Sequence, residues 1–217
     1  MNSNQHLNLL VLGGTGNVGK LVIASALKKG YKVRSLTRNI KKVPKFPEGE
    51  VEWVEGSVLD AATVNKVVQG QDAVISVLGP KGTGKTTLYS ESAKLVVDAM
   101  KANNIGRYLV ITPGTSSPKQ GFLIKWLLPK ILKNLRADSK VMEDYFTGLN
   151  DANINWTIVR PFPMKGGAAK GYRVGAGDAS SLTPPLVPTT VRADLADFLV
   201  TEATEKKWNN QIVTIGK

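Results

Sequence analysis

The sequence contains no cysteine and only one histidine, His6. The lack of cysteine excludes a disulfide framework, a thiolate nucleophile and a cysteine-ligated metal site. A single histidine in the leading segment makes a histidine-based catalytic triad or metal cluster implausible. We therefore expect no bound metal and no chemistry that depends on these two residue types.

Aromatic residues are also scarce, at 6%, and they are not interleaved with basic residues as in stacking platforms for single-stranded nucleic acid. The net charge of +12 favours a solubilising lysine surface and an anionic cofactor over nucleic-acid binding. No apolar run is long enough to span a bilayer, and residues 1–8 lack the charged and apolar regions of a leader. We expect a cytoplasmic protein with a small-molecule substrate, no nucleic-acid partner and no integral membrane segment.

The sequence does contain a repeated alternation of apolar strand and helix patterns. With 217 residues, 42% of them hydrophobic, the chain can bury a substantial core. The alternation predicts an α/β fold, a doubly wound parallel sheet with helices on both faces, in a single domain spanning 1–217. Strands are expected at 7–12, 31–38, 51–56, 72–78, 107–112, 155–160 and 211–216, and helices at 17–30, 60–70, 88–104 and 193–204.

The stretch 161–191 departs from this alternation. It is rich in glycine, proline and threonine and has no clear helical pattern. Long irregular segments inside compact domains are usually functional. We interpret it as a substrate loop or lid, which forms a small C-terminal lobe within the single domain.

A glycine-rich loop, GGTGNVGK at 13–20, joins the first expected strand to the first expected helix. Gly13 would permit a tight turn, Gly16 would let the backbone approach a pyrophosphate, and Gly19 would let helix and strand pack closely. The pyrophosphate would then face the free N–H groups of the helix N-terminus. This arrangement predicts a dinucleotide site.

The end of the second expected strand indicates which dinucleotide is bound. A site for NAD usually has an acidic residue there, which accepts a hydrogen bond from the ribose 2′-hydroxyl. Here the sequence reads VRSLTRNIKK, with no carboxylate between Arg34 and Lys42. Arg38 is the best placed of its basic residues to bind a 2′-phosphate through its planar fork of donors. The prediction is NADP(H).

A second loop, GPKGTGKTT at 79–87, matches the phosphate-loop pattern of nucleotide hydrolases letter for letter. Such a site also needs an acidic residue at the end of a neighbouring strand to hold magnesium, and no expected strand ends in a suitable one. We interpret the match as a coincidence. The loop lies at the sheet edge where ligands bind, so Gly79 and Pro80 could border the cofactor and Lys85 could approach it.

Taken together, these motifs resemble the atypical short-chain dehydrogenase/reductases, in particular the NAD(P)H-binding branch with biliverdin/flavin reductase-like and NmrA-like proteins. The resemblance is carried by LLVLGGTGNVGK, VRSLTRN, GSVLDAATV, QDAVISVLG, AMKANNIGRYLVIT, INWTIVRP and VRADLADFLV, in that order. It implies a Rossmann fold with NADP(H) over the glycine loop. The implied cofactor contacts are Gly13, Thr15, Gly16, Asn17, Val18, Arg38, Ser57, Val58, Leu78, Gly79, Thr112, Pro161, Phe162 and Pro163.

The catalytic residues of that superfamily are not visible here. Ordinary members use a Tyr-x-x-x-Lys pair, but Arg136 stands four residues before Lys140, and arginine cannot act as a general acid. Flavin reductase-like members use a serine and a histidine at places that here hold Pro113 and Pro163. Catalysis must therefore rest on other groups.

Two residues are left as catalytic candidates. Thr112, at the end of the fifth expected strand, could donate a hydrogen bond to a substrate carbonyl or the nicotinamide amide. Asp138 interrupts an apolar helical stripe within 128–149 and could donate a proton. Each also has a structural interpretation: a strand-end threonine bonded to the backbone, and a helix-surface or capping aspartate.

The apolar and basic stretch 121–140 allows several interpretations. A core-packed helix, restarted at Pro129, is favoured over a membrane-surface segment, a substrate cap or a subunit contact of a homodimer. For function, we expect an NADPH-dependent reductase of a flavin, quinone or small carbonyl compound. A non-catalytic NADP(H)-binding redox sensor, and an isomerase or lyase of the same fold, stay open.

Overall fold

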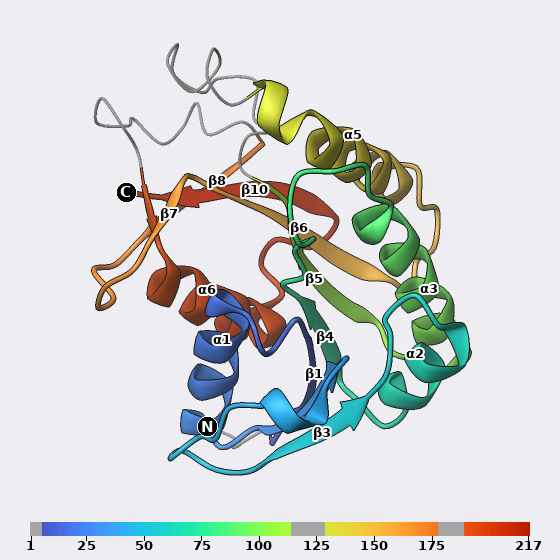
Figure 1. The fold of residues 1–217 in the computed structure, drawn as a ribbon, viewed down its shortest axis with the longest axis vertical. Helices are drawn as coiled ribbons and strands as arrows, with labels where there is room; N and C mark the ends of the chain where they lie inside the picture. The colour runs from blue at the N-terminus through green and yellow to red at the C-terminus, as the bar shows by residue number, and fades with distance from the viewer. Residues whose placement is uncertain (1–5, 114–128, 178–188) are drawn as a thin grey trace.

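A mostly parallel sheet forms the centre of the computed structural model, which describes residues 6–113, 129–177 and 189–217 (Figure 1). Its strand order is β3-β2-β1-β4-β5-β6-β10-β8. The chain moves outward from β1 in one direction and then restarts at β4 in the other, so the switch point of this open sheet lies between β1 and β4. The strands are β1 (Asn8–Leu12), β2 (Lys32–Thr37), β3 (Val51–Glu55), β4 (Ala73–Ser76), β5 (Arg107–Ile111), β6 (Asn155–Pro161), β8 (Arg173–Ala176) and β10 (Gln211–Gly216).

Helices cover both faces of this sheet, as Figure 1 shows. On one face lie α1 (Asn17–Lys28) and α6 (Arg192–Glu205), which pack against each other. On the other face lie α2 (Ala61–Val68), α3 (Leu88–Ala102) and α5 (Pro129–Thr147). The predicted doubly wound α/β fold is therefore confirmed. In the described residues, no helix is both long and apolar enough to cross a membrane.

The central strand β1 shows why the sequence folds this way. Leu9 and Val11 point into the core beneath α1 and α6, whereas Leu10 and Leu12 point into the core beneath the other three helices. All four side chains are fully buried. A continuous apolar run is what a parallel strand covered on both faces requires.

The elements expected from the sequence form within a few residues of their predicted bounds. Asp60 caps α2, because its carboxylate accepts a 2.9 Å hydrogen bond from the Thr63 N–H. Helix α5 begins at Pro129. Proline is tolerated at the first position of a helix, because the N–H that it lacks would have no partner within the helix and its fixed φ is compatible with helical geometry. The segment 121–128 of the basic apolar stretch lies outside the described residues.

The expected loop at 161–191 contains strands that the sequence pattern did not reveal. β8 pairs antiparallel with β10, with Val174 opposite Ile215, and so extends the main sheet at its edge. β7 (Met164–Lys165) pairs with β9 (Thr190–Val191) in a separate two-stranded sheet. These strands are too short to show an alternating pattern, and they are fixed by their partners in the fold.

A buried ion pair ties α6 to the start of β5. Arg107 Nη2 lies 2.7 Å from Glu202 Oε1, and both side chains are 2% exposed. Glu202 Oε1 also accepts a 2.8 Å bond from the Trp208 N–H. Burial lowers the pKa of Arg107 to about 10, although the neighbouring Glu202 opposes the shift. The guanidinium is therefore still charged at neutral pH and depends on its carboxylate.

Replacing that carboxylate should destabilise the fold. Glu202→Gln keeps an acceptor for Trp208 but leaves the Arg107 charge buried and unpaired, so we expect a loss of about 3–5 kcal/mol in the free energy of unfolding. Asp144→Asn is the control, because it removes an exposed pair with Lys140 and should cost less than about 1 kcal/mol. Urea denaturation measures both, and similar losses in the two variants would contradict this account.

Candidate functional site

A cavity of about 400 Å³ lies at the carboxyl ends of β1, β2, β3 and β4, beside the switch point of the sheet. Open α/β sheets bind their ligands at this edge. Eight of the site residues predicted from the sequence line it: Gly13, Thr15, Gly16, Arg38, Ser57, Val58, Leu78 and Gly79. The cavity therefore gathers residues from four separate loops into one place.

The floor of the cavity is a glycine turn whose geometry excludes side chains. Gly13 has a φ of +89°, and a Cβ added to it would lie 2.8 Å from the Val77 carbonyl oxygen at the end of β4. A Cβ on Gly19 would lie 2.2 Å from the Gly13 carbonyl oxygen. Gly13 thus serves the tight turn and Gly19 the close packing of α1, which are the roles expected from their spacing.

The turn leads directly into the N-terminus of α1. Gly16 is the N-cap, no side chain caps the helix, and its first turn contains no acidic residue. The first N–H groups of a helix have no partner within it, and the helix dipole makes this end positive. The start of α1 is therefore suited to an anion such as a pyrophosphate.

One wall of the cavity carries a cation, the guanidinium of Arg38. Arg38 follows β2, is exposed, and forms no ion pair with any described residue. Arg34, earlier on the same strand, is occupied: it donates to the Val67 and Gln69 carbonyl oxygens and pairs with Glu52. Among the basic residues of this strand end, Arg38 is thus the one in the cavity wall.

The part of the cavity formed by the loop after β3 includes an apolar residue that sequence reasoning missed. Leu59, 45% exposed, follows Ser57 and Val58 in the loop before α2 and lines the cavity. A large apolar side chain left in contact with water next to an anion site suits a flat aromatic ring such as a purine. The sequence could have indicated Leu59, because this large apolar residue directly precedes Asp60, the residue that caps α2.

The remaining predicted contacts lie outside this cavity. Asn17 and Val18 form the first turn of α1. Thr112 follows β5, and Pro161 ends β6. The buried ring of Phe162 packs against Gly216, and the Pro163 carbonyl oxygen accepts a hydrogen bond from the Thr190 N–H. Because β5 and β6 follow β4 in the sheet, these residues continue the same edge.

Thr112 is buried, and its hydroxyl has no hydrogen-bond partner within the part of the chain that the structure describes. The residue is 2% exposed, and its N–H donates to the Val159 carbonyl oxygen at 3.0 Å. Its Oγ1 has no partner among the described residues. A buried hydroxyl left in this state costs free energy.

Asp138 has the opposite character. Its carboxylate accepts bonds from the N–H groups of Tyr89, at 2.8 Å, and Ser90, at 3.1 Å, and from the Ser90 hydroxyl. These donors belong to the first turn of α3, so Asp138 caps that helix from α5. The Asp138 carboxylate is the acceptor in all three bonds, so they give no support for Asp138 as a proton donor. Burial raises the pKa of Tyr89 to about 12, and the nearby Asp138 carboxylate contributes to the shift.

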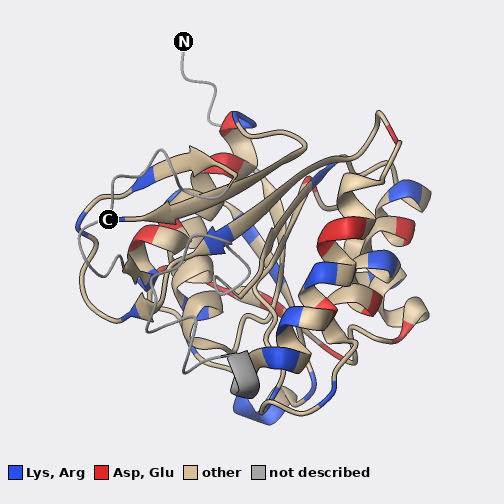
Figure 2. Ribbon diagram, turned by 90° about the horizontal axis from the view of Figure 1, so that it is seen from above, with Lys and Arg blue, Asp and Glu red and all other residues tan. Residues whose placement is uncertain are grey.

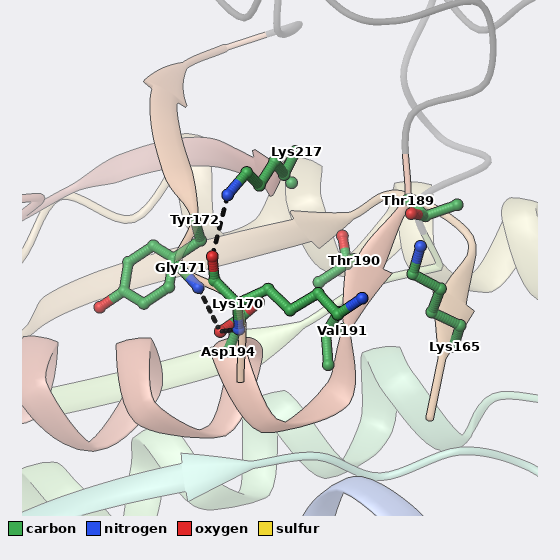
Figure 3. A pocket seen from close by; sticks show the side chains of 10 residues that line it. Lys165, Lys170, Gly171, Tyr172, Thr189, Thr190, Val191, Asp194 and Lys217 are labelled. Carbon is green, nitrogen blue, oxygen red and sulfur yellow. Dashed lines mark hydrogen bonds between the residues drawn. The ribbon is translucent and has the colours of Figure 1, made fainter. Parts of the chain in front are cut away.

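A second, smaller pocket of about 80 Å³ lies beside the N-terminus of α6 (Figure 3). Lys165, Lys170 and Lys217 surround it. Lys217 Nζ donates to the Lys170 carbonyl oxygen, and the Asp194 carboxylate accepts from the N–H groups of Lys170 and Gly171. The Lys217 ammonium and the Asp194 carboxylate are thus bonded to the backbone of this pocket.

The strong positive charge is not concentrated on the helices of one face. Figure 2 shows both basic and acidic positions on the helices of the face that carries α3 and α5. Within the described residues there is also no group of three acidic or histidine side chains that could hold a metal ion. These observations are typical of a solvated surface around an anion site.

Comparisons with known proteins agree on the class of this fold. A family model described as NAD(P)H-binding matches residues 13–206. The photosystem II assembly factor Ycf39 of Trieres chinensis is 31% identical over 48% of this chain and 33% of its own length. Ycf39 of Cyanophora paradoxa is 22% identical over 95% and 62%. This chain therefore spans less than two thirds of either Ycf39 relative.

Two further similarities involve proteins named as reductases. The isoflavone reductase homolog IRL of Zea mays is 26% identical over 98% of this chain and 69% of its own length. The solved structure of ChuY, an anaerobillin reductase from Escherichia coli O157:H7, superposes with a TM-score of 0.74 and 18% identity over 96% of both chains. At that identity, the superposition establishes the fold alone.

The packing of the glycine turn can be tested without any ligand. Alanine normally stabilises a helix relative to glycine by about 1 kcal/mol, but at Gly19 its Cβ would meet the Gly13 backbone. We expect Gly19→Ala to lower the free energy of unfolding by about 1–3 kcal/mol, as overpacking does. Gly84→Ala is the control, because nothing lies within 4 Å of its Cβ. Equal midpoints of urea denaturation for Gly19→Ala and the wild type would refute the close packing.

Proposed function

The chain belongs to the NAD(P)H-binding family, and from this premise we propose that it is an NADPH-dependent reductase of a flavin, a quinone or a small carbonyl compound. The observation that carries the proposal is the cavity of about 400 Å³ between the glycine turn and Arg38. Its floor admits no side chain at Gly13, and its wall contains the Arg38 guanidinium, which forms no ion pair with any described residue. These features fit a dinucleotide that carries an extra phosphate.

The residues would divide the cofactor between them. The first turn of α1 would hold the pyrophosphate, Arg38 the ribose 2′-phosphate, and the loop of Ser57, Val58 and Leu59 the adenine. The nicotinamide would continue along the sheet edge towards Thr112 and Pro161. When bound, NADPH supplies the hydride, and the protein supplies binding and orientation.

The Thr112 hydroxyl is the group proposed to orient the reacting parts. It has no partner in the described chain, so it could donate to a carbonyl oxygen of the substrate or of the nicotinamide amide. A donor fixed in a buried position costs little reorganisation when negative charge develops on that oxygen. We assign Thr112 this role and give Asp138 none, because its carboxylate already caps α3.

The lack of an identified proton donor bears on the substrate. Arg136 stands at the usual tyrosine place, and no described residue near Thr112 has been identified as an acid. Hydride addition to a flavin or quinone gives a delocalised anion, which takes its proton from water. We therefore favour these two classes over simple ketones. The segment 161–191 remains the proposed substrate loop.

A second candidate function is a cofactor-binding protein that acts through a partner. It is favoured by Arg136 in place of a catalytic tyrosine, and by the Ycf39 relatives, which are named as assembly factors. NADPH consumption against a panel of flavins, quinones and ketones distinguishes the two. Turnover supports the reductase, whereas tight NADPH binding without any turnover would favour the second candidate.

The choice of cofactor gives a direct prediction. Arg38→Asp removes a charge-assisted contact to the 2′-phosphate and adds repulsion, so NADPH binding should weaken by about 1–3 kcal/mol and NADH binding far less. Lys45→Asp is a matched control, because Lys45 lies in the same connection but does not line the cavity. Isothermal titration calorimetry measures both, and equal weakening for the two cofactors would show that Arg38 does not bind this phosphate.

The proposed role of Thr112 gives a second prediction. Thr112→Val keeps the shape of the side chain but removes the hydroxyl, so we expect kcat to fall about tenfold to a hundredfold, with the Kd for NADPH nearly unchanged. Because the native hydroxyl has no partner, the variant should be as stable as the wild type or more stable. A loss of stability with unchanged kcat would indicate a structural role instead.

A further inference from the structure

The loop that resembles a phosphate loop, 79–87, is divided into two parts by its own geometry. Its first residues, Gly79, Pro80 and Lys81, line the cofactor cavity. Gly82 follows with a φ of +86°, a left-handed conformation that turns the chain. None of the residues from Gly82 to Thr87 lines the cavity, and Lys85, Thr86 and Thr87 line a separate groove beside α5.

The second part is held against α3 and α5. Asn134 Nδ2 donates to the Thr83 carbonyl oxygen at 3.0 Å, and the Leu88 N–H donates to Thr86 Oγ1 at 3.1 Å. Lys85 lines a separate groove of about 580 Å³ with Asn134 and Asp138. The lysine that the sequence motif singles out therefore does not line the cavity.

Lys81 has the placement that Lys85 lacks. It is exposed, lines the cavity, and forms no hydrogen bond or ion pair with any described residue. Arg38 is the other cation in the cavity wall. Since β1 lies between β2 and β4 in the sheet, the two cations follow strands on opposite sides of the glycine turn.

The turn itself lies close to the β4 side, because a Cβ on Gly13 would meet Val77 and Leu78 at the end of that strand. A pyrophosphate above this turn and the start of α1 is therefore within the reach of the loop that follows β4. The ribose phosphate would lie beyond β1, on the Arg38 side. We propose that Lys81 binds the pyrophosphate of the dinucleotide, an inference that rests on the proposed cofactor site.

Such a contact would add a cation to a pyrophosphate site that otherwise uses backbone N–H groups. It distinguishes Lys81 from Arg38 by ligand chemistry, because the pyrophosphate is shared by NADPH and NADH whereas the 2′-phosphate is not. Lys81 would strengthen binding of both cofactors, and Arg38 would choose between them.

The test uses fragments that carry one phosphate group or the other. Binding of NADPH, NADH, ADP-ribose and 2′-AMP is measured for the wild type, Lys81→Ala and Lys85→Ala. ADP-ribose contains the pyrophosphate and no 2′-phosphate; 2′-AMP contains the reverse. Lys81→Ala should weaken NADPH, NADH and ADP-ribose about tenfold, as loss of one charge-assisted contact does, and leave 2′-AMP unchanged.

Lys85→Ala is the matched control, because it removes the same charge from the same exposed loop and should change no affinity by more than about twofold. A loss confined to NADPH and 2′-AMP, or equal effects of the two substitutions, would overturn the assignment of Lys81. A wild type that binds no dinucleotide would instead overturn the proposed cofactor site. The two failures are therefore distinguishable.

Discussion

The close contact between the glycine turn, the end of β4 and the start of α1 is the constraint on which the site depends. There is no room for a Cβ on Gly13 against the Val77 backbone, or for a Cβ on Gly19 against the Gly13 backbone. The N-terminus of α1 is consequently held at the sheet edge rather than above it. The same contact brings the loop after β4 next to the turn, so the anion site and the cavity wall have one structural cause.

The ion pairs of the arginines distinguish those that have a structural role from Arg38. Arg107 is buried with Glu202, and Arg160 bonds Glu143 through two donors, at 3.0 and 2.6 Å. Arg34 is bonded to Glu52 and to carbonyl oxygens at the end of α2. Arg38 has no such partner in the described chain. A strongly basic protein can thus satisfy its structural arginines and still present one to an anionic ligand.

Much of the fold and the anion site could be predicted from local sequence, because their causes are local. The apolar run of β1 requires cover on both faces, and the spacing of Gly13, Gly16 and Gly19 reflects contacts within one turn. The position of Lys81 could not be predicted in the same way. It depends on Asn134, which bonds the Thr83 carbonyl oxygen across 51 positions of sequence, and no short motif records such a contact.

The two buried polar residues considered for catalysis show how hydrogen-bond accounting distinguishes roles that sequence leaves open. Asp138 receives three donors from α3, so its burial is explained by the helix it caps. The Thr112 hydroxyl has no partner among the described residues, although an unpartnered buried group costs about 1–3 kcal/mol. Valine would fill the same space without that cost. The hydrogen bonds of the described chain therefore account for the burial of Asp138 and leave the burial of the Thr112 hydroxyl without a structural reason.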